Sequence, residues 1–499
     1  MKNEILTIND ADNVAVALKP LSKGLCYGTG SSGITALDDI PAGHKIALRD
    51  IKKDENIIKY GFPIGHATCD IAAGCHVHGH NIRTNLEGLL DYKYQQPYIA
   101  PFQKKHGTFM GYKRKNGRTG IRNEIWIINT VGCVNKVAER LAHEANRLFS
   151  GRTDGIYTFV HPFGCSQLGD DLDTTRKILA GLVNHPNAAG VLVLGLGCEN
   201  NNIPSFRKFL MAGSEFYSEE RFRFLSLQEA EDEIETGLSL IEELVEYAEG
   251  FERVPCPVSD LILGLKCGGS DAFSGITANP LVGALSDIII EHGGSAILTE
   301  VPEMFGAETI LMNRCSDEEV FNKMVSLINN FRRYFMKHNQ PIYENPSPGN
   351  REGGITTLEE KSLGCVYKGG TSPIADVLDF GEQVKNKGLN ILNGPGNDIV
   401  SVTNLTASGA HLILFTTGRG TPLGAPVPTL KISSNTALYE KKPNWIDFNA
   451  GVLLDGIPMG ILAGNLFDLV LKIASGEART KNEENGYREI AVFKDGVTL

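Results

Sequence analysis

From about residue 120 onward, short runs of consecutive apolar residues alternate with longer stretches in which apolar residues recur every three or four positions. Such runs are typical of strands buried on both faces of a parallel sheet, and the longer spacing is typical of helices that cover it. Strands are predicted at residues 123–131, 155–161, 188–197, 221–228, 260–267, 295–302, 388–396 and 410–420, and helices at 135–149, 174–186, 229–250 and 279–294. This alternation predicts βαβ units and doubly wound, mostly parallel α/β domains. The pattern leaves open whether they form two domains or one large sheet.

The first 95 residues have a different pattern. The segments 13–21, 44–51 and 56–71 are short, alternate apolar with polar residues, and are separated by glycine and proline. They predict a small β-rich module at residues 1–95, followed by a polar, proline-containing linker at 96–110. A chain of 499 residues is too long for one core, so the remainder is divided into α/β domains at 111–255 and 256–499.

Composition narrows the class of protein. Lys and Arg total 48 against 59 Asp and Glu, and no basic block stands out, so neither nucleic acid nor a membrane surface is expected as a partner. The acidic N-terminus is unlike a signal peptide, and every apolar run is too short to span a bilayer. The ten cysteines form no CxxC pair, which excludes a disulfide scaffold or zinc knuckle. A cytoplasmic protein with reduced thiols is expected.

Thiols and an imidazole follow the ends of several predicted strands. Cys133, Cys198 and Cys267 each stand one or two residues beyond an apolar run, and His161 ends the run that leads to Cys165. Since the carboxyl ends of parallel strands share one edge, these groups could converge there on a transition metal such as iron. A single cysteine after a strand is more often a small buried hydrophobe. For the group as a whole, the metal site is the favoured interpretation.

The segment CGGSDAFSGITANP, which begins at Cys267, leads from a strand into a helix and is the best anion-binding candidate. Its glycines permit close approach of backbone N–H groups, and the helix that follows presents its positive end. A carboxylate or phosphate would fit, although an elaborate helix cap has the same composition. Two Gly- and Pro-rich loops carry Arg351 and Arg419, which suit a sugar-acid carboxylate; ordinary surface turns are the alternative.

The N-terminal module contains a histidine cluster, CHVHGHNIRTN. His76, His78 and His80 alternate, so in a strand they would share one face, as metal binding or general-base chemistry requires. A polar strand edge without a ligand explains the spacing equally well. His44 is isolated in the sequence, and on that observation alone it is expected to be structural.

Many ordered motifs together resemble the altronate/galactarate dehydratase family, over essentially the whole chain. They are HVHGHNIRTNL, GIRNEIWIINTVGCVN, HPFGCSQLGDD, VLGLGCENN, CGGSDAFSGITANP, EVPEMFGAE, NPSPGN, GGITTLEEKSLGC and TTGRGTP. The resemblance implies an N-terminal SAF-type β-clip domain followed by domains of Rossmann-like character. It also implies a cytoplasmic lyase that removes water from a small sugar acid, converting D-altronate to 2-dehydro-3-deoxy-D-gluconate in hexuronate catabolism. The HVHGHN segment favours altronate over galactarate or a related acid, and the family suggests a homo-oligomer, with a dimer as the expectation.

The resemblance also implies roles for individual residues. The expected cofactor is Fe²⁺, with Mn²⁺ as a substitute and an iron–sulfur cluster held by three cysteines as the less favoured alternative. Expected metal ligands come from Cys133, His161, Cys198 and Cys267. Expected substrate-binding residues are Gly268, Gly269, Ser270, Asp271, Asn279, Asn350 and Arg419. Proton transfer is expected from His44 or His78, with His76 beside them; only the resemblance points to His44.

Two other classes share parts of this pattern. A nicotinamide-dependent dehydrogenase would have the same kind of sheet, but it should carry a complete GxGxxG fingerprint and a downstream acidic residue, which the chain lacks. A sugar-acid sensor would keep the carboxylate pocket without needing thiols and histidines at the strand ends.

Overall fold

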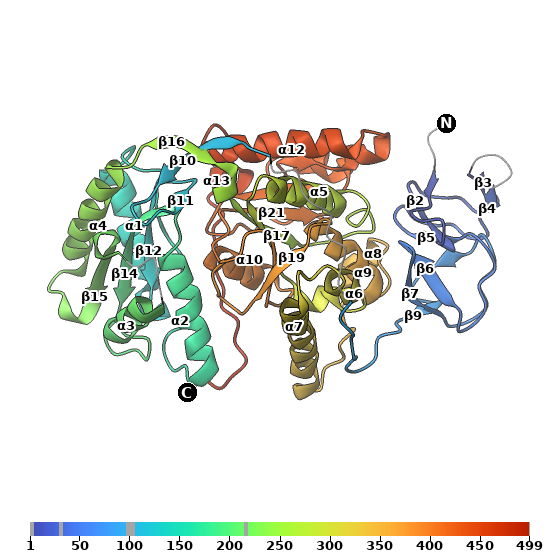
Figure 1. The fold of residues 1–499 in the computed structure, drawn as a ribbon, viewed down its shortest axis with the longest axis horizontal. Helices are drawn as coiled ribbons and strands as arrows, with labels where there is room; N and C mark the ends of the chain where they lie inside the picture. Colours follow the sequence, from blue (N-terminus) through green and yellow to red (C-terminus); the bar gives the residue numbers. More distant parts are fainter. Residues whose placement is uncertain (1–3, 29–32, 96–104, 214–217, 499) are drawn as a thin grey trace.

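The computed structural model describes residues 4–28, 33–95, 105–213 and 218–498, arranged as three bodies in a row. The N-terminal β domain lies at one end, the second domain at the other, and the C-terminal domain between them (Figure 1). The expected fold class is confirmed: a small β domain precedes two α/β domains, each with its own parallel sheet. Residues 96–104 of the expected linker lie outside the described residues. Within the described residues, no helix combines the length and apolar character needed to cross a membrane.

The N-terminal domain consists of short strands in three small sheets, ordered β1-β2-β5-β8, β6-β7-β9 and β3-β4. Its pairings are antiparallel, which explains the alternating sequence pattern and the frequent turns. The strands are β1 (Ile5–Leu6), β2 (Val14–Ala17), β3 (Cys26–Tyr27), β4 (Ile34–Thr35), β5 (Lys45–Ala47), β6 (Asn56–Lys59), β7 (Phe62–Ala67), β8 (His76–Val77) and β9 (Ile82–Arg83).

The second domain has a four-stranded parallel sheet, ordered β13-β12-β14-β15, between helices. Its elements are β12 (Glu124–Asn129), α1 (Asn135–Leu148), β13 (Ile156–Thr158), α2 (Gly169–Val183), β14 (Ala188–Gly195), α3 (Ile203–Gly213), β15 (Phe222–Ser226) and α4 (Glu233–Glu249). Along β12, Ile125 and Ile127 pack into one core, whereas Trp126 and Ile128 pack into another that the C-terminal domain shares. Burial on both faces explains why this strand is continuously apolar.

The C-terminal domain is built on a seven-stranded parallel sheet, ordered β19-β20-β18-β17-β21-β22-β23. Its strands are β17 (Ile262–Cys267), β18 (Ser295–Leu298), β19 (Ile374–Leu378), β20 (Leu389–Leu392), β21 (Leu412–Thr417), β22 (Thr429–Ser433) and β23 (Phe448–Asn449). Its helices are α5 (Ala278–Glu291), η6 (Val301–Met304), α6 (Glu308–Met312), α7 (Glu318–Lys337), α8 (Pro348–Glu352), α9 (Leu358–Val366), α10 (Asp398–Ala407), α11 (Thr436–Lys441), α12 (Met459–Ala474) and α13 (Lys481–Glu484). A separate antiparallel sheet consists of β10 (Thr108–Lys113), β11 (Thr119–Gly120) and β16 (Arg253–Pro257). In the chain, β10 and β11 precede the sheet of the second domain, and β16 follows it.

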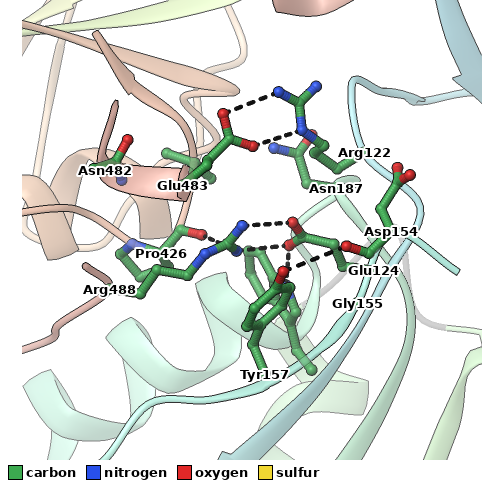
Figure 2. A network of polar contacts seen from close by, with 12 residues as sticks. Arg122, Glu124, Asp154, Gly155, Tyr157, Asn187, Pro426, Asn482, Glu483 and Arg488 are labelled. Atoms are coloured by element: carbon green, nitrogen blue, oxygen red, sulfur yellow. Dashed lines mark hydrogen bonds and ion pairs between the residues drawn. The ribbon is translucent and has the colours of Figure 1, made fainter. Parts of the chain in front are cut away.

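Two buried ion pairs join the second domain to the end of the chain (Figure 2). Arg488 pairs with Glu124 at 2.8 Å, and its guanidinium lies 3.8 Å from the centre of the Tyr157 ring. Arg122 pairs with Glu483 at 2.8 Å. All four charged side chains are at most 6% exposed, so each depends on its partner for charge compensation.

We expect Glu124→Ala to lower the free energy of unfolding by about 3–5 kcal/mol, because it leaves the Arg488 charge buried and unpaired. Urea denaturation followed by fluorescence measures the loss. The control is Glu139→Ala, which breaks a pair with Lys136 whose side chains are 41% and 89% exposed and should change stability by less than about 1 kcal/mol. Equal effects of the two substitutions would contradict a structural role for the buried pair.

Candidate active site

A buried ion network fixes the N-terminal domain to the C-terminal domain. Lys45 of β5 and Lys59 of β6 pair with the same carboxylate, Glu360 of α9, at 2.9 and 2.7 Å. Lys45 also donates to the Gly354 carbonyl at 2.8 Å. Burial alone would raise the pKa of Glu360, but the charges of Lys45 and Lys59 outweigh it and hold that pKa well below its usual value. Burial lowers the pKa of Lys45 to about 8, although Glu360 opposes this shift.

Further hydrogen bonds extend this interface. The carboxylate of Glu359, beside Glu360 on α9, accepts from the Thr84 hydroxyl at 2.8 Å and from the Asn85 N–H at 2.6 Å. Thr357 caps α9 and donates its hydroxyl to the Ile64 carbonyl. The first turns of α9 therefore bind strands and loops of the N-terminal domain at several points, which sets the position of that domain.

Three histidines of the N-terminal domain meet at this interface. β5 and β8 pair antiparallel with Lys45 opposite Val77, so His44 lies across from His78 and next to His76. The Nδ1 of His44 is 3.0 Å from the Nε2 of His76, and the His44 and His78 ring centres are 4.6 Å apart. One nitrogen from each ring falls within 4.8 Å of one from each of the others.

All three imidazoles favour the neutral form. Burial lowers the pKa of His76 to about 4 and that of His78 to about 3, and it lowers the pKa of His44 as well. The Nε2 of His44 is 3.2 Å from the Glu352 carbonyl oxygen, which can only accept, so Nε2 carries the proton and Nδ1 presents its lone pair. The buried Nδ1 of His78 has no hydrogen-bond partner among the described residues. Converging neutral imidazoles are the donor set that a divalent transition metal requires.

The glycine loop that follows β17 lies next to this cluster. Gly43, beside His44, approaches Ala272 and the Gly353 carbonyl, and the Ala272 N–H donates to that same carbonyl at 2.9 Å. Gly269 is exposed and adopts a left-handed φ of +62°, while its carbonyl accepts from the Arg419 N–H at 2.9 Å. The Arg419 side chain is 47% exposed and lies 3.3 Å from the Glu352 carboxylate. An exposed glycine backbone and a guanidinium thus stand beside the histidines.

The other expected substrate-binding residues are buried and hold the loop in shape. Ser270 contacts the Cys267 sulfur at 3.5 Å, and Asp271 accepts from Ser274, Ser434 and Asn435. The side-chain amide of Asn279 donates to the Gly364 carbonyl and accepts from the Thr416 hydroxyl. Asn350 donates to the Ser270 carbonyl, and the Gly268 N–H donates to the Thr416 carbonyl. These contacts show that the buried residues stabilise the conformation of the loop. Gly269 and Arg419 are the members of the expected set that are exposed to solvent.

Three family models match consecutive parts of the chain. They are described as Altronate/galactarate dehydratase SAF domain (residues 3–85), D-galactarate dehydratase/Altronate hydrolase, second domain (111–249), and D-galactarate/Altronate dehydratase, C-terminal (258–498). The chain belongs to the altronate/galactarate dehydratase family. It is therefore an enzyme of a hydro-lyase family.

Full-length relatives agree with this assignment to the family. The chain is 50% identical to altronate dehydratase of Bacillus subtilis (strain 168), over 99% of both chains. It is also 50% identical to altronate dehydratase of Escherichia coli (strain K12), over 99% of this chain and 100% of the relative. Galactarate dehydratase (L-threo-forming) of Escherichia coli (strain K12) is 32% identical, over 98% of this chain and 96% of the relative.

The four expected metal ligands do not form one group. Cys133, His161 and Cys198 follow strands of the second domain, whereas Cys267 ends β17 in the other sheet. His161 is occupied on both ring nitrogens, by the Asn129 carbonyl and the Phe163 N–H. Cys133 and Cys198 are exposed, on loops at one edge of the second-domain sheet. Cys267 is therefore separate from the other three, because strand ends converge within one sheet and these ends belong to two. A metal site among Cys133, His161 and Cys198 stays a prediction.

A second donor group, which no sequence pattern indicates, includes Cys267. Its sulfur is 3.3 Å from that of Cys365 and 3.5 Å from a carboxylate oxygen of Glu303. Cys365 lies inside a helix, and Glu303 lies in the short 3-10 turn that follows β18. Among the described residues, this group and the three histidines are the two sets of donors close enough to share an ion.

We expect Glu360→Gln to detach the N-terminal domain, because two buried lysines lose their shared counter-charge at a cost of about 3–5 kcal/mol. The pKa of Glu360 is lowered in the folded state, so its contribution is present above pH of about 4.5 and is lost as the pH falls below that value. Limited proteolysis between pH 3 and 8 should show faster cleavage of the variant near neutrality, with the difference from wild type shrinking in acid.

The control is Asp70→Asn, which removes the exposed partner of Lys52 in the same domain. It should be cleaved at the wild-type rate at every pH where the protein is folded. A Glu360→Gln protein that resists protease as well as wild type at pH 7 would show that the ion network does not hold the domains together.

Proposed function

We propose that this enzyme removes water from D-altronate to give 2-dehydro-3-deoxy-D-gluconate, with Fe²⁺ as cofactor, and so acts in hexuronate catabolism. The observation that carries the proposal is the placement of three neutral imidazoles beside an exposed glycine and an arginine. Two full-length relatives named altronate dehydratase support the choice of substrate, because they are more similar to this chain than the galactarate dehydratase is.

His44, His76 and His78 are the residues we assign to the metal. Three imidazoles would leave positions free for substrate oxygens, and the buried, unpartnered Nδ1 of His78 would be satisfied by such an ion. A metal bound there supplies Lewis acidity, which stabilises negative charge on the substrate as the C2 proton leaves. Mn²⁺ offers the same charge and ligand preference.

The other roles belong to residues around the cluster. Arg419, with the exposed backbone of Gly269, binds the substrate carboxylate by charge-assisted hydrogen bonds. Proton abstraction needs a base outside the three metal-binding rings. His80 is exposed, and its ring centre lies 5.4 Å from that of His76, so it is the imidazole we assign to this step. This assignment moves proton transfer away from His44 and His78, the residues that sequence reasoning selected.

The substrate assignment is tested with a panel of aldonates and aldarates. Iron-loaded protein, purified without oxygen, should form a 2-keto-3-deoxy acid from D-altronate at least about tenfold faster than from galactarate, a difference of roughly 1.4 kcal/mol in transition-state stabilisation. The product is measured by a colorimetric assay for 2-keto-3-deoxy acids. Faster turnover of galactarate would overturn the choice of D-altronate, and no turnover of any acid would overturn the proposal.

The two histidine roles are separated by paired variants. His78→Ala should lose both bound iron and turnover, whereas His80→Ala should keep its iron and lose about 10²–10⁴-fold in kcat, the usual effect of removing a general base. Iron content is measured by elemental analysis beside the rate. His66→Ala, which changes a half-buried histidine of the same domain outside the cluster, is the control and should leave both unchanged. Full iron content with no turnover in His78→Ala would instead make His78 the base.

A further inference from the structure

We propose that the C-terminal domain binds a second divalent transition metal, held by the sulfurs of Cys267 and Cys365 and the carboxylate of Glu303. The three donors form a closed triangle: 3.3 Å between the sulfurs, and 3.2 and 3.5 Å from Glu303 Oε2 to the sulfurs of Cys365 and Cys267. Ser270 places its hydroxyl 3.5 Å from the Cys267 sulfur and is the fourth donor.

The size of this triangle suits one ion. Metal–sulfur bonds of about 2.3 Å and metal–oxygen bonds of about 2.0 Å place tetrahedral ligands roughly 3.3–3.8 Å apart. The observed edges are at or just below that range, so the donors need to separate by less than about half an ångström. Two thiolates and a carboxylate in tetrahedral geometry favour Zn²⁺ or Fe²⁺ over hard ions such as Mg²⁺.

The donors come from three distant parts of the chain. Cys267 ends β17, Glu303 lies in η6, and Cys365 lies in α9, and all three are at most 4% exposed. Such a buried group cannot meet the substrate. It therefore positions other parts of the site, and metal enters it as the domain folds.

The surrounding charges make metal binding electrically neutral. Three buried lysines border the group: Lys361 pairs with Glu303 at 2.8 Å, Lys368 pairs with Glu300 at 3.1 Å, and Lys266 pairs with Glu300 and Asp398. Three positive charges thus face three carboxylates while both thiols are protonated. A divalent ion that displaces the two thiol protons leaves the net charge of the group unchanged.

The two sulfurs are in contact but are not bonded to each other. At 3.3 Å, the sulfurs are much farther apart than the roughly 2.05 Å of a disulfide, so this is a reduced pair.

A metal here would anchor the start of the glycine loop. Ser270 follows the exposed Gly269, and its carbonyl is held by the amide of Asn350, which Lys361 also contacts. The ion would tie the end of β17 to η6 and α9, and α9 carries Glu360 of the interdomain network. The second site would thus stabilise both the glycine loop and the helix α9 that holds the N-terminal domain in place.

The experiment compares metal content in wild type, Cys365→Ser and the control Cys315→Ser, whose thiol is buried elsewhere in the domain. Proteins prepared with Co²⁺ as the only added metal are analysed for cobalt per chain and for the near-ultraviolet thiolate-to-cobalt absorption band. Wild type and Cys315→Ser should show the band, and Cys365→Ser should lack it and carry one ion fewer per chain. The melting temperature of Cys365→Ser should also rise less with added metal than that of wild type, because only the histidine site remains to bind it.

His78→Ala separates this inference from the histidine site. That variant should keep the thiolate–cobalt band whether or not the histidines bind metal. If Cys365→Ser does not fold, a mercurial reagent added to wild type should displace one cobalt and abolish the band. Wild type without the band, an unchanged band in Cys365→Ser, or isolation of a Cys267–Cys365 disulfide from protein made under reducing conditions would each overturn the proposal.

Discussion

The active site depends on one buried interaction, the contact of Glu360 with both Lys45 and Lys59. The N-terminal domain alone would bury two lysines without a carboxylate, and the C-terminal domain alone would bury a carboxylate without a cation. Either unpaired charge would cost several kcal/mol in a buried environment. The charges are compensated only when β5 and β6 rest on α9. Since His44 immediately precedes Lys45, the residue that closes this network also places the histidines against the glycine loop.

The same interface brings together the residues of the proposed active site. The histidines come from the N-terminal domain, whereas Gly269 and Arg419 come from loops after β17 and β21 of the C-terminal sheet. Ligands of open α/β sheets bind at the carboxyl ends of the strands, and here the N-terminal domain covers that edge with three histidines. The second domain shares an apolar core and two buried ion pairs with the C-terminal domain, which makes it a support for that sheet.

Most of the fold could be predicted from the sequence. The apolar runs at β12, β14, β17 and β21 fall where strands were expected, because strands buried on both faces must be apolar throughout. α1 occupies Asn135–Leu148, close to the predicted 135–149. The strand expected at 155–161 is shorter, Ile156–Thr158, because His161 turns inward to hydrogen-bond its neighbours.

The candidate site was only partly predictable. The alternation of His76 and His78 in the sequence indicates that their side chains lie on the same face of a strand. His44 joins them only because β5 pairs with β8, and no pattern around His44 in the sequence indicates this contact. Cys365 and Glu303 were missed because they reach Cys267 through tertiary packing of a helix and a turn, and such contacts leave no spacing in the sequence. Cys267 was expected beside Cys133, His161 and Cys198 because all four follow strands, but a shared local pattern does not place residues in the same sheet.

Iron held by the interdomain histidines beside the glycine loop can be located by anomalous diffraction from crystals of the iron-loaded enzyme, recorded above and below the iron absorption edge. We expect an iron peak bonded to His44, His76 and His78. An iron peak at Cys133, Cys165 and Cys198, with none at the histidines, would rule out the proposed metal site.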